Sequence, residues 1–338
     1  MRKILALLLI LLLVTPVFAQ EAEKNKIFIL NSFQKGLNTK ENPYTLPKGS
    51  ATIAENVRLD KEGGSLAKRD TIRLYGGTTS ETPVLGLHKL YMADLTAILL
   101  RNLSSTISTG NDATGAFTDI LTVTTADRRW QWLTWHNVAI GTDGYNQPVK
   151  YDGSSASATY IGSCLGLDAG SGAGPDGTYL YKVTFYTTTY EVSLGASSNT
   201  VVVVDNDIDL TMIPIAPDTY AGESVTGRKI YRTEDGGTTY KILSNGVIAN
   251  NTAVTLTDSD ADGALGATLN PTVTLTPPKG RLCIIHKNRL WIANNPDHPS
   301  RVYYSDSGSE NYFPSANYFD VRTNDGDEVT LMKNLLEN

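Results

Sequence analysis

The strongest chemical pattern in the chain is a run of alternating carboxylates. Asp258, Asp260 and Asp262 precede Gly263, which is how a loop that surrounds a calcium ion begins. The twelfth position of such a loop carries a bidentate Glu, but here it is Leu269. Because the ligand set is incomplete, the pattern favours a polar turn, and we assign no metal ligand to it.

The other candidates for chemistry are equally incomplete. Residues 233–240 resemble the Asp-box hairpin turn of sialidase-type propellers, which is structural and remote from catalysis. The glycine-rich residues 170–174 precede no helix pattern that could supply amides to a phosphate, so they are interpreted as a linker. Two facing carboxylates would suffice for a glycosidase, and sequence alone does not exclude them. We predict no catalytic residue, no cofactor and no enzyme.

Histidine and cysteine also form no recognisable ligand set. The chain has four histidines, at His88, His136, His286 and His298, without metal-ligand spacing. His136 and His286 fall at equivalent positions of two similar stretches, which favours packing. The two cysteines, Cys164 and Cys283, are a candidate disulfide if the protein is exported, and two buried thiols are the alternative.

Composition predicts a mostly β protein. With 338 residues, 41% of them hydrophobic, the chain can bury a large core and has room for about two domains. Only 19% of residues are charged, whereas Tyr (17) and Gly (29) are frequent, as in strands joined by tight turns. The net charge of −6 provides no general basic surface for nucleic acid.

Two similar stretches predict the architecture. The segment that starts at His136 and the segment that starts at His286 each read as strand, loop, Pro and strand, about 150 residues apart. Removing an insert of roughly 100 residues leaves a period near 50, typical of a four-stranded propeller blade, although a generic hairpin similarity is the alternative. Residues 170–276 have the strand count of an immunoglobulin-like sandwich and resemble fibronectin type III modules inserted in phage tail proteins and secreted bacterial proteins.

The predicted fold is therefore all-β: a β-propeller-like platform, incomplete as a ring, interrupted by the sandwich. The predicted divisions are residues 1–19 (leader), 20–169 (N-terminal arm and first propeller-like strands), 170–276 (sandwich) and 277–338 (continuation of the platform).

Residues 1–19 have the form of a secretory signal peptide. Arg2 and Lys3 precede an apolar run over residues 4–14, and a small-residue site ending at Ala19 precedes Gln20. The run is too short to span a bilayer comfortably, so we expect no stable membrane anchor after its removal. This feature predicts an exported, periplasmic or extracellular protein.

The N-terminal arm carries a family resemblance. KGLNTKENPY (35–44), AENVRLD (54–60) and GGSLAKR (63–69) closely resemble the N-terminus of tail nozzle (tail tubular protein B-like) and packaged-DNA stabilisation proteins of short-tailed bacteriophages, with Lys35 in place of a Gly. RLWIA (289–293) and VYYSD (302–306) resemble the middle of the same family, which implies that the chain stops before the ring of blades closes. The arm residues expected to contact a neighbouring subunit are Gly36, Leu37, Asn38, Pro43 and Asn56.

The resemblance implies a virion structural protein. Its expected partners are copies of itself in a ring, the portal and adaptor proteins of the tail, and double-stranded DNA that passes without sequence-specific binding. Such a conduit would retain packaged DNA and open during ejection. The leader favours a second hypothesis, an exported bacterial surface or periplasmic propeller and sandwich protein that binds glycan or protein.

Overall fold

The computed structural model describes residues 82–322 and 326–334, together with short pieces between residues 36 and 68. The chain divides into two compact units, Met1–Arg73 and Leu74–Asn338. In the first unit, β1 (Gly36–Leu37) pairs in parallel with β2 (Ser50–Ala51), and β3 (Val57–Leu59) pairs antiparallel with β4 (Leu66–Lys68). The leader and the predicted contact residues Asn38, Pro43 and Asn56 lie outside the described residues.

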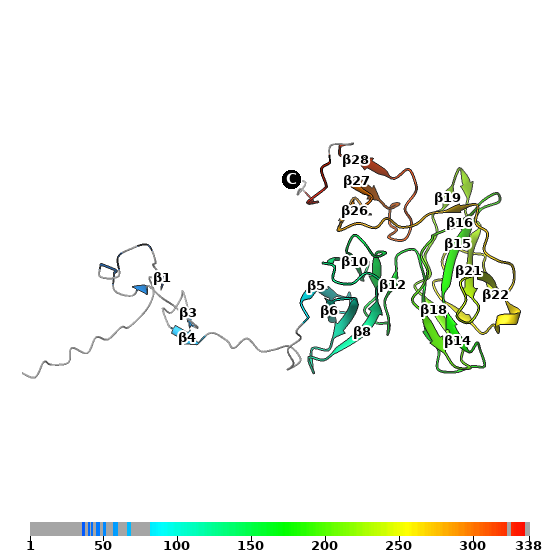
Figure 1. Cartoon of the computed structure of the whole chain (residues 1–338), viewed down its shortest axis with the longest axis horizontal. Coiled ribbons are helices and arrows are strands. Elements are labelled where there is room, and N and C mark those ends of the chain that lie inside the picture. The colour runs from blue at the N-terminus through cyan, green and yellow to red at the C-terminus, as the bar shows by residue number, and fades with distance from the viewer. Residues whose placement is uncertain are drawn as a thin grey trace, which may run out of the picture. The chain divides into compact units, whose positions relative to one another are not determined.

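The prediction of an all-β fold is confirmed. The helical structure of the described residues is one turn of 3-10 helix, η1 (Asp262–Ala264), and strands make up the rest of the regular structure. The second unit holds three four-stranded sheets and a sandwich (Figure 1).

The three sheets are antiparallel meanders in chain order. The first sheet consists of β5 (Val84–Tyr91), β6 (Ala97–Leu103), β7 (Thr106–Gly110) and β8 (Phe117–Thr122). The second consists of β9 (Gln131–Trp135), β10 (Val138–Thr142), β11 (Val149–Tyr151) and β12 (Thr159–Tyr160), and the third of β25 (Leu282–His286), β26 (Arg289–Asn295), β27 (His298–Tyr304) and β28 (Tyr318–Asp320).

The first strands of the sheets lie next to one another, since β5 contacts β9 and β9 contacts β25. β5 begins at Val84 and β9 at Gln131, 47 residues later, close to the predicted period. Four strands per sheet and adjacent first strands are features of propeller blades. The described residues form three such sheets in series.

The turns within the sheets correct one detail of the repeat. His136 and Asn137 both have positive φ (51° and 62°), as do Lys287 and Asn288 (48° and 55°). Positive φ at both central residues defines the two-residue type I′ turn that suits a twisted hairpin. Trp135 therefore corresponds to His286, and His136 to Lys287. The predicted equivalence of His136 and His286 is wrong by one residue.

The inserted module packs two sheets face to face. A five-stranded sheet has the order β22-β21-β15-β16-β24, a three-stranded sheet the order β13-β18-β23, and β14 pairs with β17. The strands are β13 (Leu165–Asp168), β14 (Gly177–Tyr179), β15 (Tyr181–Tyr186), β16 (Glu191–Ser193), β17 (Val201–Val203), β18 (Ile208–Thr211), β21 (Gly227–Thr233), β22 (Tyr240–Ile248), β23 (Leu256–Asp258) and β24 (Val273–Thr274), with a small hairpin of β19 (Thr219–Tyr220) and β20 (Glu223–Ser224).

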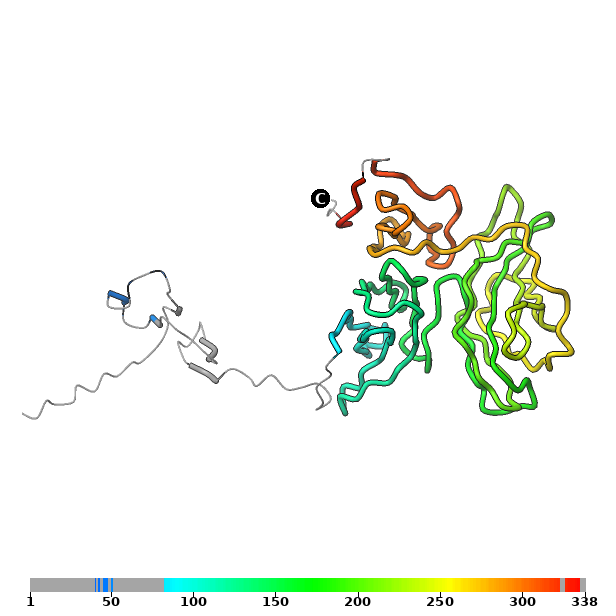
Figure 2. The backbone as a smooth tube through the Cα atoms, viewed as in Figure 1, coloured from blue at the N-terminus to red at the C-terminus, as the bar shows by residue number. Residues whose placement is uncertain are grey.

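The sandwich begins at β13, before the glycine-rich segment that the sequence analysis took as its start. Gly172 and Gly174 lie against residues 206 and 207, where a Cβ would approach within 2.3 Å and 2.5 Å of other heavy atoms. Glycine is thus required there by close packing within the module. Figure 2 follows the chain from the second sheet through the sandwich and back to the third sheet.

Hydrophobic clusters hold these layers together. One cluster fills the sandwich, with Tyr181 and Val183 of β15 against Ile208 and Leu210 of β18. A second cluster joins the first and second sheets, and a third joins the second and third sheets. A fourth joins the sandwich to Tyr312, whose ring meets Phe185 edge-on at 5.6 Å between centroids.

Candidate functional site

The predicted polar turn at residues 258–263 is the centre of a buried network, which we call the aspartate clasp. Oδ2 of Asp258 accepts hydrogen bonds from Arg232 Nη1 at 2.8 Å and from the Tyr181 hydroxyl at 2.7 Å. The side chains of Arg232 and Asp258 are both 0% exposed. Burial raises the pKa of Asp258, and the Arg232 guanidinium and the Tyr181 hydroxyl oppose this rise.

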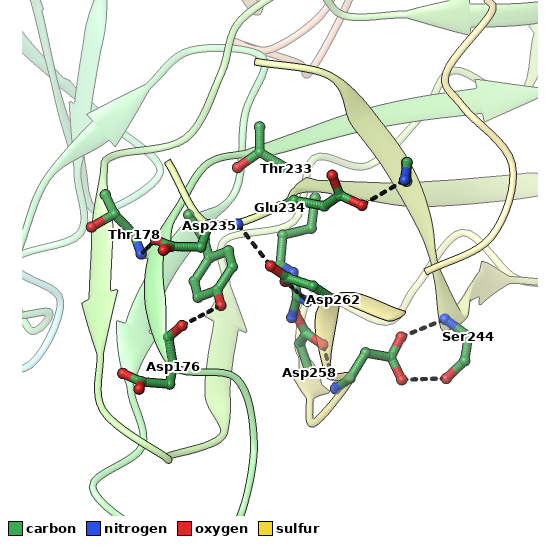
Figure 3. Close-up of polar contacts among 12 residues, drawn as sticks. Asp176, Thr178, Thr233, Glu234, Asp235, Ser244, Asp258 and Asp262 are labelled. Carbon is green, nitrogen blue, oxygen red and sulfur yellow. Dashed lines mark hydrogen bonds and ion pairs between the residues drawn. The ribbon is translucent and has the colours of Figure 1, made fainter. Parts of the chain in front are cut away.

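Of the other two carboxylates of the clasp, Asp262 shares Arg232 with Asp258, whereas Asp260 has a separate partner (Figure 3). Asp262 accepts from Arg232 Nη2 and from the amide of Asp235, each at 2.9 Å. Asp260 accepts from the amide and the hydroxyl of Ser244, each at 2.6 Å. These side chains do not converge on one point but link the turn to β21 and β22. In the described part of the chain no group of three or more His, Cys, Asp or Glu side chains is arranged to hold a metal ion.

The Asp-box-like segment is the turn between β21 and β22, next to the clasp. Asp235 Oδ1 accepts from the amide of Thr178 at 2.7 Å, and Glu234 forms an ion pair with Lys241 at 2.6 Å. Gly177 has a φ of +145°, and a Cβ there would approach Asp235 within 2.3 Å. The segment therefore has a structural role in attaching β14 to the hairpin.

A buried lysine, which the sequence analysis missed, joins three parts of the second unit. Lys150 lies on β11 and is 1% exposed. Its Nζ donates to the backbone oxygen of Met212 in the sandwich at 3.2 Å and to Oδ1 of Asn311 at 2.9 Å. The same Asn311 oxygen accepts from the amide of Gly162 at 3.1 Å. Lys150 thus connects the second sheet, the sandwich and the segment that follows the third sheet's β27.

Lys150 borders a groove of about 730 Å³ between the sandwich and the sheets. Burial lowers the pKa of Lys150 to about 8, and the charge of Glu310 opposes part of this shift. Such a lysine can act as a nucleophile when its amine is free. Here two oxygen acceptors hold the ammonium, so the geometry favours a structural junction.

The two cysteines are buried free thiols in different cores, and the structure contains no disulfide between them. Cys164 packs in the sandwich cluster, whereas Cys283 packs between the second and third sheets. Burial raises the pKa of Cys164 to about 12 and that of Cys283 to about 11. Neither thiol has the depressed pKa of a reactive cysteine.

Three histidines make aromatic contacts. His88 stacks on Trp132 and forms a 2.9 Å hydrogen bond between Nε2 and the Thr134 hydroxyl. His136 stacks on Trp135 at 4.4 Å between centroids, and His286 meets Trp291 at 6.1 Å. Of the two histidines for which packing is predicted, His286 is half-buried, whereas His136 stacks on its neighbour at an exposed position.

The outer face of the third sheet, here called the third-sheet face, is apolar and partly open. In the second sheet, Ile140 is buried in the cluster shared with the third sheet, and Leu133, Trp135 and Val138 are partly buried against it. When the β9–β10 and β25–β26 hairpins are aligned at their two-residue turns, the corresponding positions in the third sheet are Ile284, His286, Arg289 and Trp291. Three of these, Ile284, His286 and Trp291, line a groove of about 510 Å³ that residues 329–334 border.

The first sheet has an open apolar face as well, the first-sheet face. Leu87 and Tyr91 on β5 are 63% and 65% exposed, although the neighbouring Leu90 is fully buried against the second sheet. Because side chains alternate along a strand, Leu87 and Tyr91 point away from that core. Lys89 lies between them on the same side of β5 and forms an ion pair with Asp112 at 3.3 Å, so this exposed face combines apolar and charged groups.

The predicted contact arm is described only in part. Gly36 and Leu37 form β1 and pair with Ser50 and Ala51. Among the described residues, no helix is long and apolar enough to cross a bilayer.

Neither a scan against protein-family models nor a search of curated proteins found a match to this chain.

Proposed function

We propose that this chain is a structural component of a short-tailed phage tail, a nozzle-like conduit that retains packaged DNA and passes it during ejection. The observation that carries the proposal is the N-terminal arm, whose KGLNTKENPY and AENVRLD segments resemble that family. The serial four-stranded sheets, with β5 beside β9 and β9 beside β25, are consistent with the propeller-like platform that the resemblance implies.

The open sheet faces support an assembly of copies. The contacts between the described sheets bury apolar side chains, and the third-sheet and first-sheet faces also present apolar side chains, which no other sheet of the described residues covers. In the proposed assembly these two faces and the arm contact neighbouring copies, and the tail's portal and adaptor proteins contact the assembled ring. An interface that joins two different faces closes into a ring if its rotation allows.

The polar chemistry of the described residues supports a mechanical role. The clasp carboxylates accept hydrogen bonds from Arg232, Tyr181 and Ser244, and Lys150 is held between two acceptors. These groups stabilise the fold. The net charge of −6 is compatible with a wall along which DNA slides.

The alternative is an exported bacterial protein that binds glycan or another protein at its surface. Residues 1–19 favour it, because virion parts assemble in the cytoplasm whereas this segment has the pattern of a secretory leader. The aromatic groups of the third-sheet face, Trp291 and Phe319, would be its binding surface.

The two functions are separated by peptide mass spectrometry on purified phage particles and on the exported fraction of the source culture. Stoichiometric recovery from particles is the expected result, and the first peptide shows whether the leader survives. Recovery only from the exported fraction, with Gln20 as the first residue, would exclude the tail function and support the alternative.

A further inference from the structure

A second pocket, here called the arginine pocket, lies at one end of the second and third sheets. It has a volume of about 440 Å³ and lies where β9 and β25 begin and β10 and β26 end. Arg128 and Arg129 reach it from the segment before β9, and Arg281 from the residue before β25. Tyr145, in the turn between β10 and β11, forms part of the wall.

Arg128 is held in place before any ligand binds. Its guanidinium lies 3.7 Å from the centroid of the Tyr145 ring, a contact that restrains the side chain. Its Nε is buried and has no hydrogen-bond partner. A buried donor without an acceptor is costly, so this position favours an acceptor supplied from outside the chain.

The three arginines have no carboxylate partner within 4.0 Å among the described residues, although acidic groups also line the pocket. Asp143 is committed to its own turn, because its oxygens accept from the amides of Tyr145 and Asn146 and from Asn146 Nδ2. Asp127 and Glu328 are exposed, where water screens their charge. The acidic groups of the lining match the arginines in number, but none of them is ion-paired to an arginine, so the guanidinium groups keep free donors for a ligand.

We propose that the arginine pocket binds a phosphate group. A planar carboxylate is satisfied by one arginine in a bidentate pair, whereas a tetrahedral phosphate has oxygens that point in several directions. Arginines from two separate segments of the chain line this one pocket, so a phosphate has enough oxygens to accept from more than one of them. The phosphate comes either from free inorganic phosphate or from the backbone of a nucleic acid.

The nucleic-acid source rests on the proposed function, in which DNA passes the protein. Three arginines can neutralise at most about three phosphates, and each one contributes a slope of about −0.9 in log K against log salt. Such binding is weak and independent of sequence. Weak binding of this kind suits DNA that is retained in the conduit and later passes through it.

The test uses the full-length chain and three variants. Arg281→Gln removes an exposed charge from the pocket, and Arg128→Gln removes the stacked one. Lys287→Gln is the matched control, because Lys287 is exposed in the turn at the opposite end of β25. Circular dichroism and thermal unfolding verify that each variant is folded. If Arg128→Gln fails to fold, Arg281→Gln decides.

Two binding measurements distinguish the sources: calorimetric titration with inorganic phosphate, and fluorescence anisotropy of a labelled DNA duplex of about 20 base pairs at several salt concentrations. We expect Arg281→Gln to weaken binding about tenfold in one or both titrations, which corresponds to one lost charged contact, and Lys287→Gln to leave it unchanged. An effect on phosphate alone assigns the free ion, and an effect on DNA, with a salt slope smaller by about 0.9, assigns the nucleic acid.

The proposal is overturned if neither phosphate nor DNA binds, or if Lys287→Gln weakens binding as much as Arg281→Gln. Its failure is distinct from failure of the proposed function. Recovery of the protein from virions together with loss of the arginine effect would refute the pocket alone. Arginine-dependent binding of phosphate by a protein absent from virions would support the pocket and refute the tail function.

Discussion

The aspartate clasp provides the sharpest test of the structure. Asp258→Ala removes a carboxylate that pairs with Arg232 at 2.8 Å while both side chains are fully buried. The same substitution leaves the Tyr181 hydroxyl without its 2.7 Å acceptor. Arg232 keeps a second partner, Asp262, which is 35% exposed on its side chain.

The expected loss follows from these contacts. Breaking a buried ion pair by removing one partner costs about 3–5 kcal/mol, since the remaining charge stays buried. An orphaned hydroxyl alone costs about 1–3 kcal/mol, and the two terms overlap because they share one oxygen. With Asp262 still present, we expect the free energy of unfolding to fall by about 3 kcal/mol, near the lower end of the range.

The assay is urea unfolding of the full chain, followed in parallel by far-ultraviolet circular dichroism and by tryptophan fluorescence. The four tryptophans, Trp130, Trp132, Trp135 and Trp291, lie in or beside the second and third sheets, so their fluorescence does not report on the sandwich directly. The fall in the free energy of unfolding should therefore be larger when unfolding is followed by circular dichroism than by fluorescence. The slope of that free energy against urea concentration should stay unchanged.

Glu234→Ala is the control, because it removes an ion pair with Lys241 in which the two side chains are 49% and 31% exposed. Its expected cost is about 0–1 kcal/mol. A loss below about 1 kcal/mol in Asp258→Ala, or an equal loss in the two variants, would refute the view that the buried pair holds the sandwich together.

Three further predictions concern the junction and the thiols. The pKa of Lys150 is about 8 in the folded chain and 10.5 in the unfolded chain, so between these pH values the unfolded chain binds more protons than the folded chain. The free energy of unfolding should therefore rise with pH above pH 8, by up to about 1.4 kcal/mol per pH unit. This gain is lost as the pH falls back through 8. Denaturant titrations at several pH values should show this slope in the wild type relative to Lys150→Met, and equal slopes would contradict it. Asn311→Ala leaves the Gly162 amide without its acceptor and removes one of the two acceptors of Lys150, which keeps the backbone oxygen of Met212. It should lower the free energy of unfolding by about 1–3 kcal/mol, measured by urea titration, and no change would exclude the junction. Both cysteines should resist a disulfide-exchange reagent at pH 8 in the folded chain and react after denaturation, whereas absence of any reactive thiol in the denatured, unreduced chain would indicate a disulfide.

Several features of the fold could be predicted from local sequence. Alternation such as Tyr181, Val183 and Phe185 predicts a strand with a buried face, and the structure has β15 there. The period near 50 is reproduced by the spacing of β5 and β9. The incomplete calcium pattern predicts a polar turn because a missing ligand is visible in the sequence itself.

The errors came from boundaries and register. The glycine-rich segment reads as a linker, yet Gly172 and Gly174 lie inside the sandwich because residues 206 and 207 pack against them. Matching His136 with His286 shifts the two similar stretches by one residue. The residue types do not show which two positions of each turn have positive φ, and those positions set the alignment.

That the chain is built from strands can be read from local sequence, because side-chain alternation, turn residues and composition act over a few neighbouring positions. Which distant groups come together is set by the packing of the sheets: Arg232 pairs with Asp258, Lys150 with Met212 and Asn311, and Arg128 lines the same pocket as Arg281. Such contacts depend on how sheets pair and stack, and their partners lie up to 161 residues apart. Local propensity contains no information about encounters at that separation, so the buried charges and the pocket emerge only when the sheets have packed.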